Sequence, residues 1–170
     1  MRYKATHALK GTLDEVLEIV MDRSRDPEVY TNITSNRRTR WEECGDKIHC
    51  EYLVCGNGDI PKPLRLIAAP HMFTWRETGH WDMPGHAYHY RLKPFYFANI
   101  FKAWGIIRFS ENGPESVIRE LEGEVRIELP LVGPLASRTI VGYMLGNYEK
   151  EAHEFDKYLM RLRETRKSCD

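Results

Sequence analysis

The stretch VIRELEGEVRIELPLVGPLASRTI, residues 117–140, changes its period from that of a strand to that of a helix. In its first half the odd positions are mostly apolar and the even positions are mostly charged, which predicts a strand with one buried face. Pro134 then suits the first turn of a helix. The helical spacing continues, and a helix over 134–166 would be about 50 Å long. A last strand followed by a long amphipathic helix is therefore the basic unit of the predicted fold.

The apolar stripe of this long helix should pack against the sheet. Its members recur at helical spacing. They are Leu135, Val141, Leu145, Tyr148, Ala152, Phe155, Leu159 and Leu162.

The chain before the sheet predicts one strand and two short helices. Residues 2–10 form the strand, which stops at Gly11. Thr12 is a good N-cap, and Glu15 three residues later completes a capping box, so a helix should begin here. A second helical piece is predicted from Asp26-Pro27-Glu28 to about Ile33, because proline is favoured at the start of a helix.

Six further strands are predicted where the apolar period is two. They cover residues 37–44, 47–55, 71–82, 85–92, 100–110 and 115–129. Turn signals separate them, such as Gly45-Asp46, Pro84-Gly85, Lys93-Pro94 and Asn112-Gly113-Pro114. Strands at hairpin spacing predict an antiparallel meander. Three prolines within residues 56–70 argue against a central strand there, so we expect a loop or an edge piece.

Composition narrows the class of protein. The 170 residues carry 25 basic and 25 acidic side chains, so no overall field favours nucleic acid or anionic lipid as a partner. The length suits one domain over 1–170, with a flexible tail at 166–170. No stretch approaches the apolar length of a membrane span, and the N-terminus lacks a secretory signal.

The four cysteines, at positions 44, 50, 55 and 169, have neither zinc-site spacing nor the density of a disulfide scaffold. We expect reduced thiols and a cytoplasmic location. No phosphate-binding loop, dinucleotide fingerprint or nucleophile elbow is present, so we expect no cofactor.

The order of elements resembles that of the START-like, helix-grip superfamily (SRPBCC). The stretches IPKPLRLIAAPHMFTWRE (60–77) and EGEVRIELPLVGPLASRTI (122–140) are similar to a family of bacterial START-like domains. The resemblance implies an α+β fold in which a curved antiparallel sheet of about seven strands wraps around the C-terminal helix. It also implies a pocket between them, which in relatives holds lipids, sterols, polyketides or other apolar molecules.

The histidine-rich stretch HWDMPGHAYHYRL, residues 80–92, has two interpretations. His86 and His89 are three apart and point to opposite faces of a strand, so a metal site is disfavoured. The even positions His86, Tyr88, Tyr90 and Leu92 are the more apolar set and should face the helix. They form either a pocket wall or plain core packing.

Arg119 falls on the buried face of the last strand, where an unpaired charge is costly. Its partner is either an anionic head group of a ligand or an internal carboxylate such as Glu77, unless the side chain reaches solvent from near the strand end. Gly123 on the same face leaves a gap that is filled or stays as cavity. Gly142 and Gly146 weaken the long helix by about 1 kcal/mol each relative to alanine, which suggests close packing or a ligand.

We therefore predict a binding or carrier protein for a hydrophobic small molecule, with no nucleic-acid partner, no metal and no stable membrane insertion. The predicted ligand-binding residues are Tyr52, Trp75, His86, Tyr88, Tyr90, Arg119, Leu145 and Tyr148. Two alternatives remain open. One is a cyclase- or dehydratase-like enzyme acting on such a ligand, and the other is a protein-interaction module with a collapsed pocket.

Overall fold

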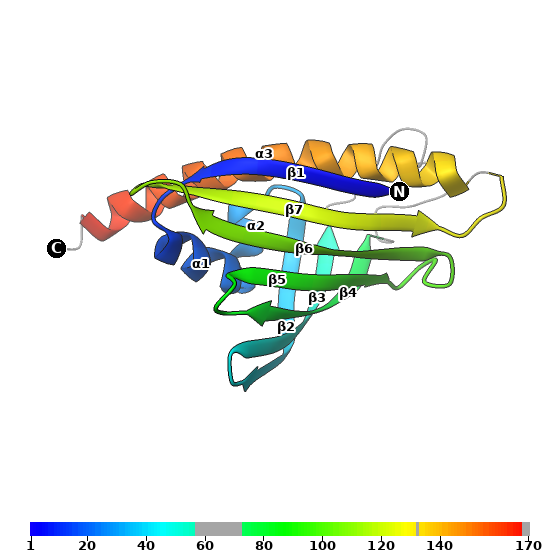
Figure 1. Ribbon diagram of the computed structural model, residues 1–170, viewed down its shortest axis with the longest axis horizontal. Helices are drawn as coiled ribbons and strands as arrows, with labels where there is room; N and C mark the ends of the chain where they lie inside the picture. Colours follow the sequence, from blue (N-terminus) through cyan, green and yellow to red (C-terminus); the bar gives the residue numbers. More distant parts are fainter. Residues whose placement is uncertain (57–72, 132, 168–170) are drawn as a thin grey trace.

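The computed structural model describes residues 1–56, 73–131 and 133–167, which form one curved antiparallel sheet and a long helix across it (Figure 1). The strands are β1 (Arg2–Lys10), β2 (Ile33–Cys44), β3 (Lys47–Gly56), β4 (Thr74–Asp82), β5 (Ala87–Pro94), β6 (Phe101–Glu111) and β7 (Ser116–Ile127). The helices are α1 (Leu13–Met21), the 3-10 turn η1 (Arg23–Arg25), α2 (Asp26–Val29) and α3 (Gly133–Lys167). This architecture confirms the predicted fold class.

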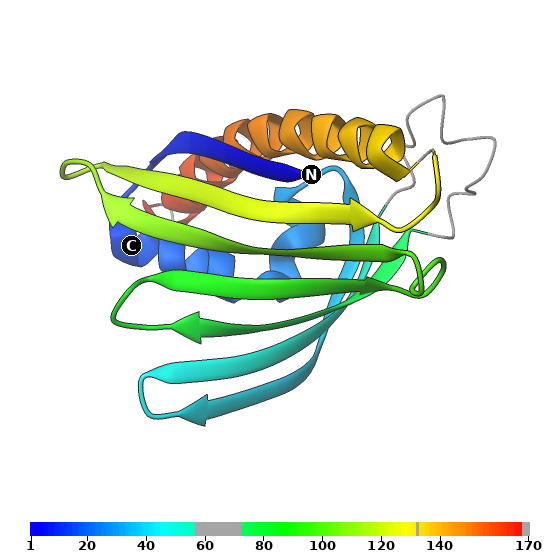
Figure 2. The same cartoon turned by 45° about the vertical axis from the view of Figure 1, so that its right-hand side comes forward.

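The strand order is β1-β7-β6-β5-β4-β3-β2, so the meander from β2 to β7 is extended by the first strand at its far edge. Arg2 pairs with Glu124 and Lys10 with Ser116. The helix α3 lies along β1 and β7, and α1 and α2 occupy the concave side of the sheet (Figure 2). The curved sheet and α3 therefore enclose the interior from different sides.

Several predicted boundaries need correction. The second helix ends at Val29 and not at Ile33, because Tyr30 already has an extended backbone and Ile33 begins β2. The fourth strand starts at Thr74, and the predicted loop over 56–70 lies almost wholly outside the described residues. Lys93 and Pro94 end β5 rather than forming the turn, which is made by residues 95–100.

Caps and side-chain bonds hold the helices in place. The predicted capping box is present, with the Glu15 N–H donating to Thr12 Oγ1 at 3.3 Å and the Thr12 N–H donating to Glu15 Oε2 at 2.9 Å. The same carboxylate accepts from Arg163 on α3 at 2.6 Å, which holds the pKa of Glu15 low, at about 2. Near the start of α3, the Ser137 hydroxyl accepts from the Ile127 N–H of β7 at 3.1 Å. The long helix is thus bonded to the rest of the fold near both of its ends.

A row of glycines crosses the sheet. Gly79, Tyr90, Gly105, Gly123 and Tyr3 are successive partners on β4, β5, β6, β7 and β1. Tyrosine rings lie on the glycines, since a Cβ at Gly105 would be 2.7 Å from the Tyr90 hydroxyl and one at Gly123 would be 2.5 Å from the Tyr3 hydroxyl. Glycines covered by aromatic rings allow a sheet to bend strongly. The gap expected at Gly123 is therefore filled by Tyr3.

Gly142 and Gly146 have a different environment from the one expected. A Cβ at either position would meet nothing within 4 Å, and both residues are exposed on α3. The idea that they allow close packing is therefore wrong. Leu135, assigned to the buried stripe, is also exposed, whereas Val141, Phe155 and Leu159 of that stripe are buried.

Two further observations bear on the sequence expectations. Cys44, Cys50 and Cys55 are free thiols, and Cys169 lies outside the described residues. Within the described part of the chain, no helix combines the length and apolarity that a membrane crossing requires.

The glycine row can be tested by adding one methyl group. We expect Gly105→Ala to lower the free energy of unfolding by about 1–3 kcal/mol, because its Cβ would press on Tyr90 and on the Glu122 carbonyl. Gly142→Ala is the matched control and should raise it by about 0.5–1 kcal/mol, since alanine is the better helix former and has room. Urea denaturation measures both, and equal effects would contradict the assigned role of the row.

Candidate functional site

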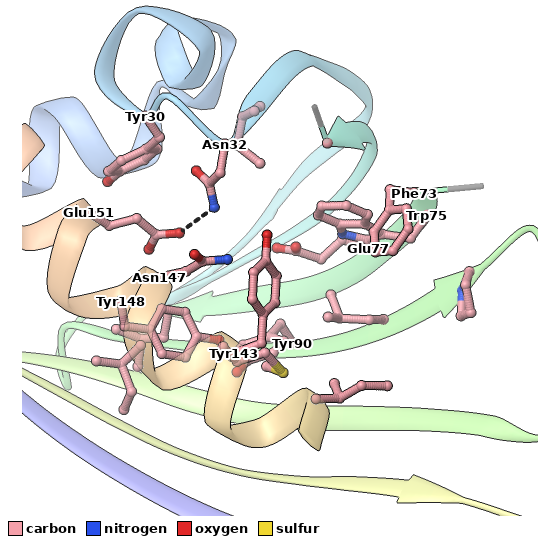
Figure 3. A pocket seen from close by; sticks show the side chains of 18 of the residues that line it. Tyr30, Asn32, Phe73, Trp75, Glu77, Tyr90, Tyr143, Asn147, Tyr148 and Glu151 are labelled. Carbon is pink, nitrogen blue, oxygen red and sulfur yellow. Dashed lines mark hydrogen bonds between the residues drawn. The ribbon is translucent and has the colours of Figure 1, made fainter. Parts of the chain in front are cut away.

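A cavity of about 460 Å³ lies between the concave face of the sheet and α3. Most of its wall is apolar or aromatic, including Trp75 and Trp81 on β4, Ile107 on β6 and Ile140 on α3. Figure 3 shows Phe73, Trp75 and Glu77 on one side, with Tyr30, Asn32 and Glu151 across from them. The volume is that of a small-molecule site, and the polar groups are few and clustered.

The first polar cluster surrounds Arg23 of η1. Its Nε donates to Asp26 at 3.0 Å, and its Nη1 donates to Glu77 of β4. Tyr88 on β5 donates to the same Glu77 carboxylate at 2.8 Å, and Asn36 donates to Asp26 at 2.6 Å. Burial raises the pKa of Asp26, and burial together with the Glu77 charge raises that of Tyr88. The Arg23 charge is therefore fully engaged inside the protein.

The second cluster surrounds Arg119 on β7, a residue that is only 4% exposed. Its Nη2 donates to the Tyr148 carbonyl at 2.9 Å and to His7 Nδ1 at 3.2 Å. Its Nη1 is 4.0 Å from Glu151 of α3, which also accepts from Asn32 at 3.1 Å. Burial, followed by the Arg119 charge, lowers the pKa of His7.

Glu77 is therefore not the partner of Arg119. Glu77 is buried, as expected, but its carboxylate is paired with Arg23. Glu151 supplies the carboxylate for Arg119 instead. Burial raises the pKa of Glu151, against the opposing effect of Arg119.

Tyrosines connect the two clusters along the sheet. The hydroxyls of Tyr3 and Tyr90 are 2.5 Å apart, and the rings of Tyr3 and Tyr148 are 6.2 Å apart. Burial raises the pKa of Tyr90 well above its ordinary value, so its hydroxyl stays protonated as a hydrogen-bonding group. Tyr90 and Tyr148 therefore give the cavity a neutral, aromatic stretch of wall beside the charged groups.

The structure brings five of the eight predicted site residues to the cavity wall. These are Trp75, Tyr88, Tyr90, Arg119 and Tyr148. Tyr52 lies behind the wall, with the Arg23 guanidinium 4.8 Å above its ring. Leu145 packs in the core cluster that contains Tyr3 and Val141.

His86 does not line the cavity, which corrects its assignment to the pocket face. It has a φ of 44° and lies in the turn before β5, so the strand alternation starts only at Ala87. Its backbone carbonyl accepts from the Phe109 N–H at 3.0 Å.

Three other histidines form a row across the sheet. His49, His80 and His89 are cross-strand neighbours, with ring centroids 5.7 and 4.6 Å apart. Across residues 1–56, 73–131 and 133–167, no three His, Cys, Asp or Glu side chains are grouped to hold a metal ion. His71 lies outside the described residues.

Several polar wall residues escaped prediction. Tyr143, Asn147 and Glu151 line the cavity from α3. Their spacing of four residues places them on one helix face, and this spacing could have predicted that they lie together. Arg23 and Asp26 had no comparable pattern, because η1 and α2 are too short to show a period.

The raised pKa of Glu151 predicts a pH effect. Between its ordinary pKa of 4.5 and its raised value, the folded state binds more protons than the unfolded state, so stability falls as pH rises through this window. In Glu151→Gln this fall should be smaller. Urea denaturation between about pH 4 and about pH 8 measures it. Glu164→Gln, at an exposed position of the same helix, is the control, and identical pH profiles for both variants would contradict the assignment.

Neither a family model nor a curated protein sequence matches this chain. Several solved structures are similar to it. A protein from Thermus thermophilus superimposes with a TM-score of 0.67 at 13% identity, covering 95% of this chain and 99% of the other. A START superfamily protein from Mycobacterium smegmatis gives 0.64 at 14% identity, covering 95% and 98%.

A third similar structure is the Zhui aromatase/cyclase from Streptomyces sp. R1128, with a TM-score of 0.60 at 14% identity, covering 98% of this chain and 94% of the other. At such identities the likeness concerns the arrangement of the backbone. The seven-stranded curved sheet, the long C-terminal helix and these similar structures together show that the chain has the START-like, helix-grip fold.

Proposed function

We propose that this protein binds an uncharged hydrophobic small molecule in the cavity between the sheet and α3. The observation that carries the proposal is the cavity itself, which is about 460 Å³ in volume, has aromatic and aliphatic walls, and contains charged groups that are already paired with one another. Ligand sites of small molecules have this size and this balance of apolar wall to polar groups. A START superfamily protein and an aromatase/cyclase share the fold, which supports the same interpretation.

The charge count argues for an uncharged ligand. Three carboxyl groups, on Asp26, Glu77 and Glu151, line the cavity with only two guanidinium groups, on Arg23 and Arg119. Burial already raises the pKa of Asp26 and of Glu151, so a carboxylate or phosphate entering this space would add a further negative charge where the existing ones are disfavoured. Arg119 Nη2 already donates to the Tyr148 carbonyl and to His7 Nδ1, which supports an internal role for Arg119 over the anchoring of an acidic head group.

The free thiols of Cys44, Cys50 and Cys55 fit a reducing compartment, which supports a cytoplasmic location for this binding function.

The ligand class can be tested with two probes of equal chain length. Dodecanol should bind, and dodecanoate should bind at least about tenfold more weakly, because it brings a negative charge among the buried carboxyl groups. Isothermal titration calorimetry, at concentrations below the solubility limit of dodecanol and the micellar concentration of dodecanoate, measures both affinities. Tighter binding of dodecanoate would contradict the uncharged-ligand proposal.

Filling the cavity tests where the probe binds. Ile140→Trp places a large ring in the cavity and should weaken dodecanol binding by about tenfold or more. Lys150→Trp adds the same side chain at an exposed position of α3 and should leave binding unchanged. If dodecanol bound neither the wild type nor the control, or bound all three proteins equally, the cavity would not be its site.

Catalysis on such a ligand is the second candidate function. It is favoured by the pair of Tyr88 and Glu77, which lies at the cavity wall with Arg23 on the same carboxylate. This arrangement could move a proton at the Tyr88 hydroxyl. Product formation from a substrate of the Zhui aromatase/cyclase, lost in Tyr88→Phe while dodecanol still binds, would support it. No product with the wild type would leave binding as the function.

A further inference from the structure

One polar side chain of the cavity wall is left without a hydrogen-bond partner. Asn147 lies on the inner face of α3, one turn after Tyr143 and one turn before Glu151, and all three line the cavity. Within residues 1–56, 73–131 and 133–167, neither the nitrogen nor the oxygen of the Asn147 amide forms a hydrogen bond. Figure 3 shows this amide pointing from α3 into the cavity, between Tyr143 and Glu151. A donor and an acceptor are therefore available there to a bound molecule.

The carboxylates on either side of the cavity differ from Asn147, because they already have partners. Glu151 accepts from Asn32 at 3.1 Å. Across the cavity, the Glu77 carboxylate accepts from Tyr88 at 2.8 Å (Figure 3). These bonds engage the carboxylates within the protein, whereas the Asn147 amide can bind a ligand without breaking a bond of the fold.

Folding alone does not account for an asparagine at this position. Asparagine is a poorer helix former than leucine, and Asn147 lies in the interior of α3. Leucine has nearly the same size and would extend the apolar wall to which Ile140 and Met144 of the same helix contribute. Asn147 therefore weakens the helix and makes the wall more polar, and neither effect stabilises the folded protein.

The Asn147 amide suits an uncharged polar group. It can donate to a carbonyl oxygen, or both donate to and accept from a hydroxyl group, and it adds no charge to those already in the cavity. A hydrocarbon that covered this amide would displace its water and offer no replacement, which weakens binding. Compared with a purely apolar wall, Asn147 therefore shifts the preference of the cavity toward an apolar molecule that carries oxygen.

We propose that Asn147 selects the ligand, and that the ligand carries an uncharged carbonyl or hydroxyl oxygen that hydrogen-bonds to the Asn147 amide. This inference rests on the proposed function and narrows the ligand class from hydrophobic molecules in general to uncharged oxygenated ones. The oxygen lies beside α3 in this arrangement, and the hydrocarbon part contacts the aromatic and aliphatic wall that includes Trp75 and Ile107.

Two bicyclic probes of similar shape test the role of Asn147. α-Tetralone has a ketone where tetralin has a methylene group. Asn147→Leu should weaken the binding of α-tetralone by about tenfold and leave the binding of tetralin unchanged or slightly tighter, because only the ketone loses a hydrogen bond. Titrations followed by nuclear magnetic resonance measure both affinities in both proteins.

Lys150→Leu is the matched control, because it adds the same side chain at an exposed position of α3 and should change neither affinity. The spectra also give a direct readout of the contact. The side-chain amide resonances of Asn147, assigned by their absence in Asn147→Leu, should shift more with α-tetralone than with tetralin.

The melting temperature separates a binding role from a structural one. Since leucine is the better helix former, Asn147→Leu should leave the melting temperature unchanged or raise it by about 2 °C. A lower melting temperature together with weaker binding of both probes would instead assign Asn147 a structural role and overturn the inference.

The inference is also wrong if α-tetralone does not bind the wild type, or if Asn147→Leu affects the two probes equally. If dodecanol still binds in these cases, only the role of Asn147 fails and the proposed binding function remains. If dodecanol, α-tetralone and tetralin all fail to bind, the proposed function fails as well.

Discussion

The close approach of tyrosine rings to backbone at Gly79, Gly105 and Gly123 is the constraint on which the rest of the structure depends. A side chain at these positions would collide with the rings of Tyr88, Tyr90 and Tyr3 respectively. With glycine at these positions the rings pack directly on the backbone, which allows the sheet to bend strongly. The bent sheet encloses more space than α3 and its side chains fill. The unfilled part of this space is the cavity.

The buried charges of this interior include two ion pairs, and each pair joins two elements of the fold. Arg23 joins η1 to β4 through Glu77, and Arg119 joins β7 to α3 through Glu151. Each ion pair therefore also holds two elements together, and removing one partner would leave an uncompensated charge. The rest of the wall offers hydroxyls and apolar rings, which suits a molecule that is mostly hydrocarbon with uncharged polar groups.

Prediction from sequence succeeded where a pattern is repeated or local. The odd positions of β7 and the Thr12–Glu15 capping box are examples. It failed where the position of a side chain depends on the backbone conformation of a single residue or on a partner far away in the sequence. The left-handed φ of His86 has no periodic signal, and nothing local to Arg119 indicates that Glu151, 32 positions later, will face it. On α3 the predicted stripe missed the face of Tyr143 and Asn147, because a helix beside a cavity carries polar residues on its inner face.

The pairing of β1 with β7 has a consequence for how the chain folds. Arg2 pairs with Glu124 and Lys10 with Ser116, so β1, which is synthesised before the other six strands of this sheet, finds its place only after almost the whole sheet exists. Contacts of such long sequence separation slow folding. Until then β1 is an unpaired edge with Tyr3 and Leu9 uncovered, and such edges are prone to aggregate. During synthesis this protein should therefore depend on chaperones for its N-terminal segment more than its size alone would suggest.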